Sequence, residues 1–282
     1  MRVPILRVLF PRLLIPLVLL ALCAPVPLGP AAPAAARERR AVQASCPEHF
    51  ARGQPPALLD PRLAQGARQL CYQAFAVLHS AATRTPLWAA EHLTAERVHA
   101  ARQVPRDSEF HADRNLPEAE RAELADYARS GYDRGHLAPS GDMPTPEAQQ
   151  ESFTLANMTP QAPELNRVLW EGIESAVRTL ATRRRDLYVV TGPIFQGEQL
   201  QALRGRVLVP THLFKAVLDT RRGRAGAYVA TNTEVPEWRA VSMAELAELT
   251  GMDVFPALSP RAKQEALRLP DPTPTNPGRR RN

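Results

Sequence analysis

Two short stretches near the middle of the chain combine a potential base, a cation and oxygen donors. The first is the tetrad DRGH at residues 133–136, and the second contains Asn166 and, eight positions later, Glu174. A neutral imidazole has a reference pKa of about 6.5, so His136 can accept a proton near neutral pH. The guanidinium of Arg134 can donate two parallel hydrogen bonds to an anion. These residue types suit the activation of water against an anionic ester.

Asn166 and Glu174 lie in a segment whose apolar spacing predicts a helix. Mg²⁺ prefers oxygen ligands and usually keeps several waters, and the Asn166 amide supplies an oxygen without a negative charge. On an α-helix the two residues are separated by about 80° of rotation and about 12 Å of rise. Both can therefore face one cleft, but Glu174 is expected to hold metal-bound water rather than the ion itself. The alternative is an ordinary solvated carboxylate.

Other candidates carry alternatives of their own. Arg106 is placed to bind phosphate, although the neighbouring Arg102 and Arg114 could substitute for it. Asn157 is either a hydrogen-bond donor in the site or a turn residue. A histidine taken without the neighbours of His136 is more often a packed core residue. Asp133 is expected to orient its loop rather than to bind metal. Trp170 and His212 are expected to be structural.

Six segments that include or surround these residues together resemble the DNA/RNA non-specific endonuclease family, the ββα-metal or His-Me finger nucleases. A DRGH tetrad alone is a weak match, whereas several segments in the family's order and spacing are specific. The similarity extends from about Tyr72 to Leu258. The segments are PRDSEF at 105–110, GYDRGHLAP at 131–139, LANMTPQ at 155–161, LNR at 165–167 followed by Trp170 and Glu174, TGPIF at 191–195 and VPTHLFK at 209–215.

The resemblance implies a function and a set of roles. It implies hydrolysis of DNA and RNA without strong sequence preference, with 5′-phosphate products, Mg²⁺ as cofactor and Mn²⁺ as a plausible substitute. His136 would be the general base, Asn166 the metal ligand and Glu174 the holder of metal-bound water. Members of the family often dimerise, so a homodimer is an expectation from the resemblance. The remaining residues expected to act in catalysis or substrate binding are Arg134, Arg106, Arg167 and Asn157.

Two rival functions remain open. One is a nucleic-acid-binding protein without catalysis, which would be expected to lack the base or the metal ligand. The other is an enzyme of the same fold that acts on a different phosphodiester or a phosphomonoester, which substrate assays would distinguish.

The sequence pattern predicts both helices and strands around these residues, and therefore an α+β fold. The resemblance implies a central, mainly antiparallel sheet flanked by helices. Alternating apolar runs predict a hairpin over 71–79 and 86–93. The segment 132–143 is rich in Gly and Pro and is expected to form a short strand or loop. We expect helices at 116–130, 165–182 and 243–251, and strands at 186–195, 207–219 and 226–231.

The domain boundaries follow from composition. We expect a signal peptide at 1–36, a leader with a disulfide-bracketed segment at 37–71, the nuclease domain at 72–259 and a disordered tail at 260–282. The first range has three arginines, an apolar run and a small-residue cleavage region. An uncleaved anchor is the alternative, but the run is about half the length of a spanning helix. The protein is therefore expected in the periplasm or outside the cell, without stable membrane association.

Charge says little about partners, whereas the cysteines are informative. The net charge of +6 falls to +3 once the three arginines of the signal are removed. Cys46 and Cys71 then remain, an even number in an exported chain, and are expected to pair. Closing a loop of about 26 residues stabilises a fold by about 3.5 kcal/mol in the chain-entropy treatment. Two buried thiols are the alternative.

Overall fold

The computed structural model describes residues 46–106 and 108–275. The predicted signal peptide at 1–36, the leader up to residue 45 and the arginine-rich end at 276–282 lie outside the described residues. Within the described ranges, no helix has the length and apolar character needed to cross a membrane.

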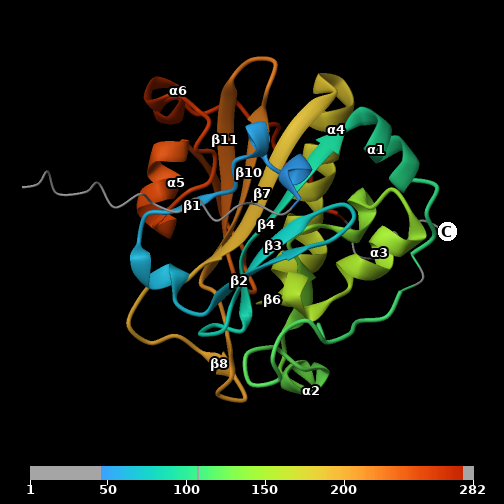
Figure 1. The fold of residues 1–282 in the computed structure, drawn as a ribbon, viewed down its shortest axis with the longest axis vertical. Helices are drawn as coiled ribbons and strands as arrows, with labels where there is room; N and C mark the ends of the chain where they lie inside the picture. Colours follow the sequence, from blue (N-terminus) through green and yellow to red (C-terminus); the bar gives the residue numbers. More distant parts are fainter. Residues whose placement is uncertain (1–45, 107, 276–282) are drawn as a thin grey trace, which may run out of the picture. The chain divides into compact units, whose positions relative to one another are not determined.

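A seven-stranded antiparallel sheet forms the centre of the fold (Figure 1). Its strands follow the order β12-β11-β10-β7-β4-β3-β2, so the prediction of a central antiparallel sheet is confirmed. The seven strands are β2 (Ala67–Cys71), β3 (Ala76–Ser80), β4 (Thr85–Thr94), β7 (Asp186–Ile194), β10 (His212–Asp219), β11 (Arg224–Thr231) and β12 (Trp238–Val241). The two-stranded pairs are β1 (Ala57–Leu58) with β13 (Met252–Asp253), β5 (Asp133–His136) with β6 (Met158–Gln161), and β8 (Ala202–Leu203) with β9 (Val207–Leu208).

Helices cover both faces of the central sheet (Figure 1). The α-helices are α1 (Ala95–Ala101), α2 (Leu124–Tyr127), α3 (Pro146–Ser152), α4 (Glu171–Arg184), α5 (Met243–Thr250) and α6 (Pro260–Gln264). A π-helical turn, η6 (Leu165–Trp170), precedes α4 directly. Helix α4 lies on one face and α5 on the other, and side chains cap several helix starts: the Ser242 hydroxyl accepts a hydrogen bond from the Glu245 amide at the start of α5.

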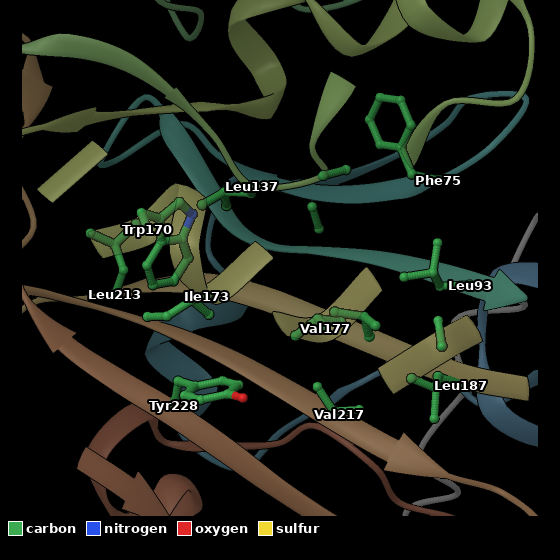
Figure 2. Close-up of a cluster of buried hydrophobic side chains, with 14 of the residues drawn as sticks. Phe75, Leu93, Leu137, Trp170, Ile173, Val177, Leu187, Leu213, Val217 and Tyr228 are labelled. Atoms are coloured by element: carbon green, nitrogen blue, oxygen red, sulfur yellow. The ribbon is translucent and has the colours of Figure 1, made fainter. Parts of the chain in front are cut away.

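Strand β10 shows how this arrangement buries both faces of the sheet. Successive side chains of a strand point to opposite faces. Leu213 and Val217 pack in the cluster that contains α4, whereas Phe214 and Leu218 pack in the cluster that contains α5. Figure 2 shows the first cluster, in which Trp170, Ile173 and Val177 lie near side chains of β10 and β11. The core thus fixes the helix that begins with η6.

Most of the predicted elements are confirmed. Strands β3 and β4 form the predicted hairpin over 71–93, and η6 with α4 and then α5 take the places of two predicted helices. The predicted disulfide between Cys46 and Cys71 is present. It ties the first described residue to the end of the edge strand β2.

The predicted helix over 116–130 is wrong. Only the single turn α2 is helical there, and the backbone of Arg129 is left-handed, with φ of 58°. Two acidic residues of the segment form ion pairs with arginines outside it. Glu120 pairs with Arg68 and Asp126 pairs with Arg206. Contacts across the fold therefore override the local preference for helix.

The chain from 260 to 275 is ordered, which corrects the predicted disordered tail for those residues. It begins with α6 and continues as an extended segment whose Leu267 and Leu269 are buried in the core. The Leu267 amide donates to the Ala225 carbonyl, and the Tyr228 hydroxyl donates to the Pro270 carbonyl. At the other end, β2 belongs to the central sheet although the sequence suggested a boundary at 71.

Candidate active site

Strands β5 and β6 form a small antiparallel ribbon that carries the DRGH tetrad. Asp133 is opposite Gln161, and His136 is opposite Met158. The glycine is required by close packing, because a Cβ atom at Gly135 would lie 2.1 Å from the Gln161 side chain. The ribbon thereby presents the histidine at the rim of the core.

The His136 ring is enclosed by two phenylalanines. Its centroid lies 5.7 Å from that of Phe110 and 4.9 Å from that of Phe153. This burial, with the positive charge of Arg106, lowers the pKa of His136 to about 3. Nε2 is buried and has no hydrogen-bond partner in the described part of the chain. The imidazole is therefore neutral at physiological pH, with an unengaged ring nitrogen, as a proton acceptor requires.

The π-helical turn η6 corrects the geometry expected between Asn166 and Glu174. A π turn contains one more residue than an α-helical turn. The extra residue of the turn makes the eight positions from Asn166 to Glu174 equivalent to seven positions of a regular α-helix. The expected angle between the two side chains about the helix axis therefore falls from about 80° to about 20°. The same correction brings Glu171 and Arg178 to within about 40° of Asn166. All four side chains accordingly line one cavity.

Two carboxylates, Glu174 and Glu171, lie on this face of the helix. The sequence pattern identified Glu174 but not Glu171. Burial raises the pKa of Glu174 to about 7, partly offset by the charges of Lys215 and Arg178. Glu171 also lines the cavity, and its Oε2 is buried without a hydrogen-bond partner among the described residues. The signal that could have found it is its spacing of five from Asn166, but only once a π turn is assumed.

Asp133 sets the orientation of the Asn166 amide. Asn166 Nδ2 donates to Asp133 Oδ2 over 2.9 Å, and Arg167 donates to both carboxylate oxygens over 2.8 and 2.6 Å. Burial opposes ionisation of Asp133, but the hydrogen bonds from Arg167 and Asn166 outweigh it and lower its pKa. An ionised carboxylate only accepts, so the amide nitrogen must face it. The amide oxygen then remains available for another ligand.

The side chains of Arg134 and Arg106, two arginines predicted to bind substrate, pack on aromatic rings at the cavity. The Arg134 guanidinium lies 4.3 Å from the Phe110 ring centroid, and that of Arg106 lies 5.5 Å from Phe153. Both line the cavity, whereas the alternatives Arg102 and Arg114 do not. The two phenylalanines that pack on His136 therefore also hold the two cations beside it.

One cavity of about 710 Å³ brings most of the predicted residues together. The predicted residues that line it are His136, Asn166, Glu174, Arg134, Arg106 and Arg167. Its charged lining comprises the arginines at 106, 129, 134, 167 and 178 and the carboxylates at 133, 171 and 174. Arginines outnumber carboxylates by five to three, so the cavity suits an anionic ligand.

Asn157 lies outside this cavity. Its side chain is fully buried, accepts from the Ala138 amide, and donates to the carbonyls of Ala138 and Ser152. The two predicted roles for Asn157 were a hydrogen-bond donor in the site and a turn residue. Its buried hydrogen bonds fit neither role. It fixes the backbone two residues after His136.

Lys215, to which the sequence pattern assigned no role, also stabilises the backbone next to His136. The side chain is 1% exposed, and its Nζ donates to the Leu137 carbonyl over 3.2 Å and to the Thr191 hydroxyl over 2.7 Å. It also lies 5.6 Å from the centroid of the Trp170 ring, which is packed in the core as expected. Lys215 thus connects the backbone next to His136 with the π turn that carries Asn166.

The oxygen donors of the cavity fit a hydrated hard cation. Among the residues that the structure describes, no group of three or more His, Cys, Asp or Glu side chains could hold a metal ion. The cavity offers instead the Asn166 amide oxygen, the unpartnered Glu171 Oε2 and Glu174. Mg²⁺ accepts few protein ligands and retains its waters, so this sparse set suits it.

Comparison with known proteins decides the family. The pattern of the DNA/RNA non-specific endonuclease family matches residues 55–261. The chain belongs to this family. Its sheet and helices agree with the α+β, ββα-metal fold expected of a DNA/RNA non-specific endonuclease, a hydrolase that acts on phosphodiester bonds.

Relatives in the non-specific endonuclease family come from distant organisms. The chain is 33% identical over 207 residues to Nuclease C1 of Cunninghamella echinulata var. echinulata, covering 66% of this chain and 82% of that protein. It is 32% identical to the mitochondrial nuclease EXOG of Danio rerio, covering 68% of this chain but only 62% of that relative. A crystal structure of an EndoG/EndoGI complex contains a similar chain, with a TM-score of 0.61 and 27% identity, covering 67% of this chain and 87% of that one.

Proposed function

We propose that the protein is an exported, Mg²⁺-dependent endonuclease that cleaves DNA and RNA with little sequence preference. The observation that carries this proposal is that His136, whose Nε2 has no partner among the described residues, and Asn166 line one arginine-rich cavity. A phosphodiester resists attack because it is anionic, so hydrolysis needs a base for the water and positive charge at the phosphate.

His136 is assigned as the general base. A water molecule that attacks phosphorus loses a proton to the imidazole nitrogen, which becomes an imidazolium as the bond to the leaving 3′ oxygen breaks. The low pKa of the free site keeps the ring neutral beforehand. A phosphate anion in the cavity offsets the charge of Arg106 and favours the imidazolium, so substrate binding strengthens the base.

Asn166 is assigned as the direct metal ligand, with Glu174 and Glu171 holding metal-bound waters. When bound there, the cation supplies positive charge to the phosphate and to the leaving oxygen. The carboxylate of Asp133 keeps the Asn166 amide oxygen available for this purpose. Mn²⁺ has similar preferences for oxygen ligands and is the expected substitute.

Arg134 and Arg106 are assigned to the scissile phosphate, with Arg167 at the edge of the cavity. Their guanidinium groups lie against Phe110 and Phe153, which limits their movement. Contacts from arginine to phosphate carry no information about base identity, and this accounts for tolerance of sequence and of both DNA and RNA. Attack by water at phosphorus with loss of the 3′ oxygen leaves 5′-phosphate ends.

Export is supported by two features of the chain. The first 36 residues have the composition of a cleavable signal, and disulfides such as that between Cys46 and Cys71 persist in oxidising compartments. We place the mature protein in the periplasm or outside the cell. A homodimer remains part of the proposal from family resemblance.

A metal titration of the purified mature chain tests this function. Supercoiled DNA, single-stranded DNA and RNA are each incubated with increasing Mg²⁺ or Mn²⁺, and the ends of the products are analysed. We expect cleavage of all three substrates, dependence on the metal and 5′-phosphate ends. Binding without cleavage would favour the nucleic-acid-binding alternative, and cleavage restricted to small phosphodiesters would favour the other-substrate alternative.

A further inference from the structure

A second, shallower groove adjoins the catalytic cavity. Its volume is about 580 Å³, and it shares Ala128, Arg129 and Tyr132 with the cavity. Its opposite wall is the segment 201–204, which contains β8. A ligand that extends beyond the cavity on this side therefore enters the groove directly. We call it the flanking groove.

Two exposed arginines face the flanking groove from opposite walls. Arg129 has no ion pair or hydrogen bond from its side chain in the described part of the chain, and Arg204 donates only to the Ala128 carbonyl. The acid of the groove, Asp126, is buried and paired with Arg206 over 3.0 Å, so it does not neutralise them. Two guanidinium groups without acidic partners make the groove selective for anions.

The wall between the groove and the cavity is held in place by Tyr132. Its hydroxyl donates to Gln201 Oε1 over 2.9 Å, which joins the segment before β5 to the opposite wall. Tyr132 lines both the cavity and the groove. It thus offers an aromatic surface at the junction, where a base can stack without regard to its identity.

We propose that the flanking groove is a second phosphate-binding subsite, in which Arg129 and Arg204 bind the sugar-phosphate backbone of the nucleotides next to the scissile phosphate. This inference rests on the proposed nuclease function and deepens it. It makes the substrate a polynucleotide rather than an isolated phosphodiester, because only a chain of phosphates can occupy the cavity and the groove together. It also predicts a preference for longer strands.

The test compares single-stranded oligonucleotides of increasing length, from 2 to about 12 nucleotides, with wild type and Arg204→Asn. Asparagine tolerates the left-handed backbone of Arg204, whose φ is 49°. For wild type, kcat/KM should rise with length as the groove fills. Loss of one charge-assisted contact should lower kcat/KM on the longest strand at least roughly tenfold, through KM, and more than on the dinucleotide. The slope of log KM against log salt should fall by about 0.7.

Arg52→Asn is the matched control. Arg52 is also exposed and left-handed, with φ of 55°, and it lines neither cavity nor groove. It removes the same charge and should leave the length dependence and salt slope unchanged. If Arg204→Asn does not fold, as judged by thermal denaturation, Arg129→Asn provides the same comparison.

The outcomes separate the subsite from the nuclease function. A wild-type enzyme whose kcat/KM does not vary with length, or an Arg204→Asn variant with the same length dependence as wild type, would overturn the subsite while leaving the nuclease function in place. A wild-type protein that cleaves no oligonucleotide in the presence of metal would overturn the proposed function, and the subsite with it.

Discussion

Asn166 donates a 2.9 Å hydrogen bond from Nδ2 to Oδ2 of Asp133, the first residue of the DRGH tetrad. The bond joins the two stretches that the sequence identified separately. It decides which end of the amide faces the cavity, because a carboxylate cannot donate. The proposed metal ligand is therefore oriented by the same ribbon that carries the proposed general base.

The first prediction concerns this orientation. Asp133→Asn replaces an obligate acceptor by an amide that can turn either way, so the Asn166 oxygen is no longer fixed. Affinity for Mg²⁺ or Mn²⁺, measured by isothermal titration calorimetry without substrate, should fall by about 10- to 100-fold. Asp253→Asn, which removes a carboxylate paired with Lys263 outside the cavity lining, is the control. Equal affinities for wild type and Asp133→Asn would exclude the orienting role.

The second prediction concerns the buried carboxylate of Glu174. Its pKa is about 7 in the folded chain against 4.5 in the reference state. Between these values the folded state holds a proton that the unfolded state has lost, so the free energy of unfolding falls as pH rises from about 4.5 to 7. Glu174→Gln lacks this proton equilibrium. Without metal, its stability relative to wild type should increase across this window, by about 1.4 kcal/mol per unit of pKa difference, and remain constant above it.

Urea denaturation in metal-free buffer at pH 5 and pH 8 measures this difference. Glu234→Gln, which removes an exposed carboxylate outside the cavity lining, is the control. A constant stability difference between wild type and Glu174→Gln at both pH values would contradict the raised pKa.

The third prediction concerns the contact between the ordered tail and α4. A Cβ atom at Gly172 would lie 2.6 Å from the Thr273 carbonyl oxygen, and Thr275 donates to the Arg167 carbonyl within the π turn. Gly172→Ala should therefore cost about 1–3 kcal/mol of stability through overpacking. In a chain that ends at Glu265 the clash is absent, and alanine should stabilise the helix slightly. The same cost in both chains would show that the tail does not pack there.

The fourth prediction concerns the disulfide. Cys46→Ser with Cys71→Ser opens a loop with a sequence separation of 25 and should lower the free energy of unfolding by about 2–4 kcal/mol. Neither cysteine lines the cavity, so nuclease activity well below the unfolding temperature should persist. Reduction of the wild-type protein should reproduce the loss in thermal denaturation. Unchanged stability would show that the bond does not constrain the unfolded chain.

The sequence predicted which residues line the cavity better than it predicted their geometry. The types and order of His136, Asn166 and Glu174, with the family resemblance, were sufficient to predict a common cavity. Their alignment was not predictable, because apolar spacing does not distinguish a π turn from an α-helical turn over one residue. Glu171 was missed for the same reason.

Other differences arise from contacts that are distant in sequence. The run 116–130 has the composition of a helix, but two of its acids, Glu120 and Asp126, pair with Arg68 and Arg206, which no local pattern reveals. The Pro-rich tail resembles a disordered end, yet Leu267 and Leu269 enter the core. Asn157 was assigned to the cavity because a polar residue in a family motif does not indicate which way its side chain points.

The central claim is that the imidazole of His136 accepts the proton of the attacking water. The most direct test is the rate of supercoiled plasmid and RNA cleavage by His136→Ala at saturating Mg²⁺, with thermal denaturation as a check on folding. His212→Ala, which removes a histidine outside the cavity lining, is the control. The rate should fall by about 10²- to 10⁴-fold in His136→Ala alone. A folded His136→Ala protein that cleaves at close to the wild-type rate would contradict the mechanism.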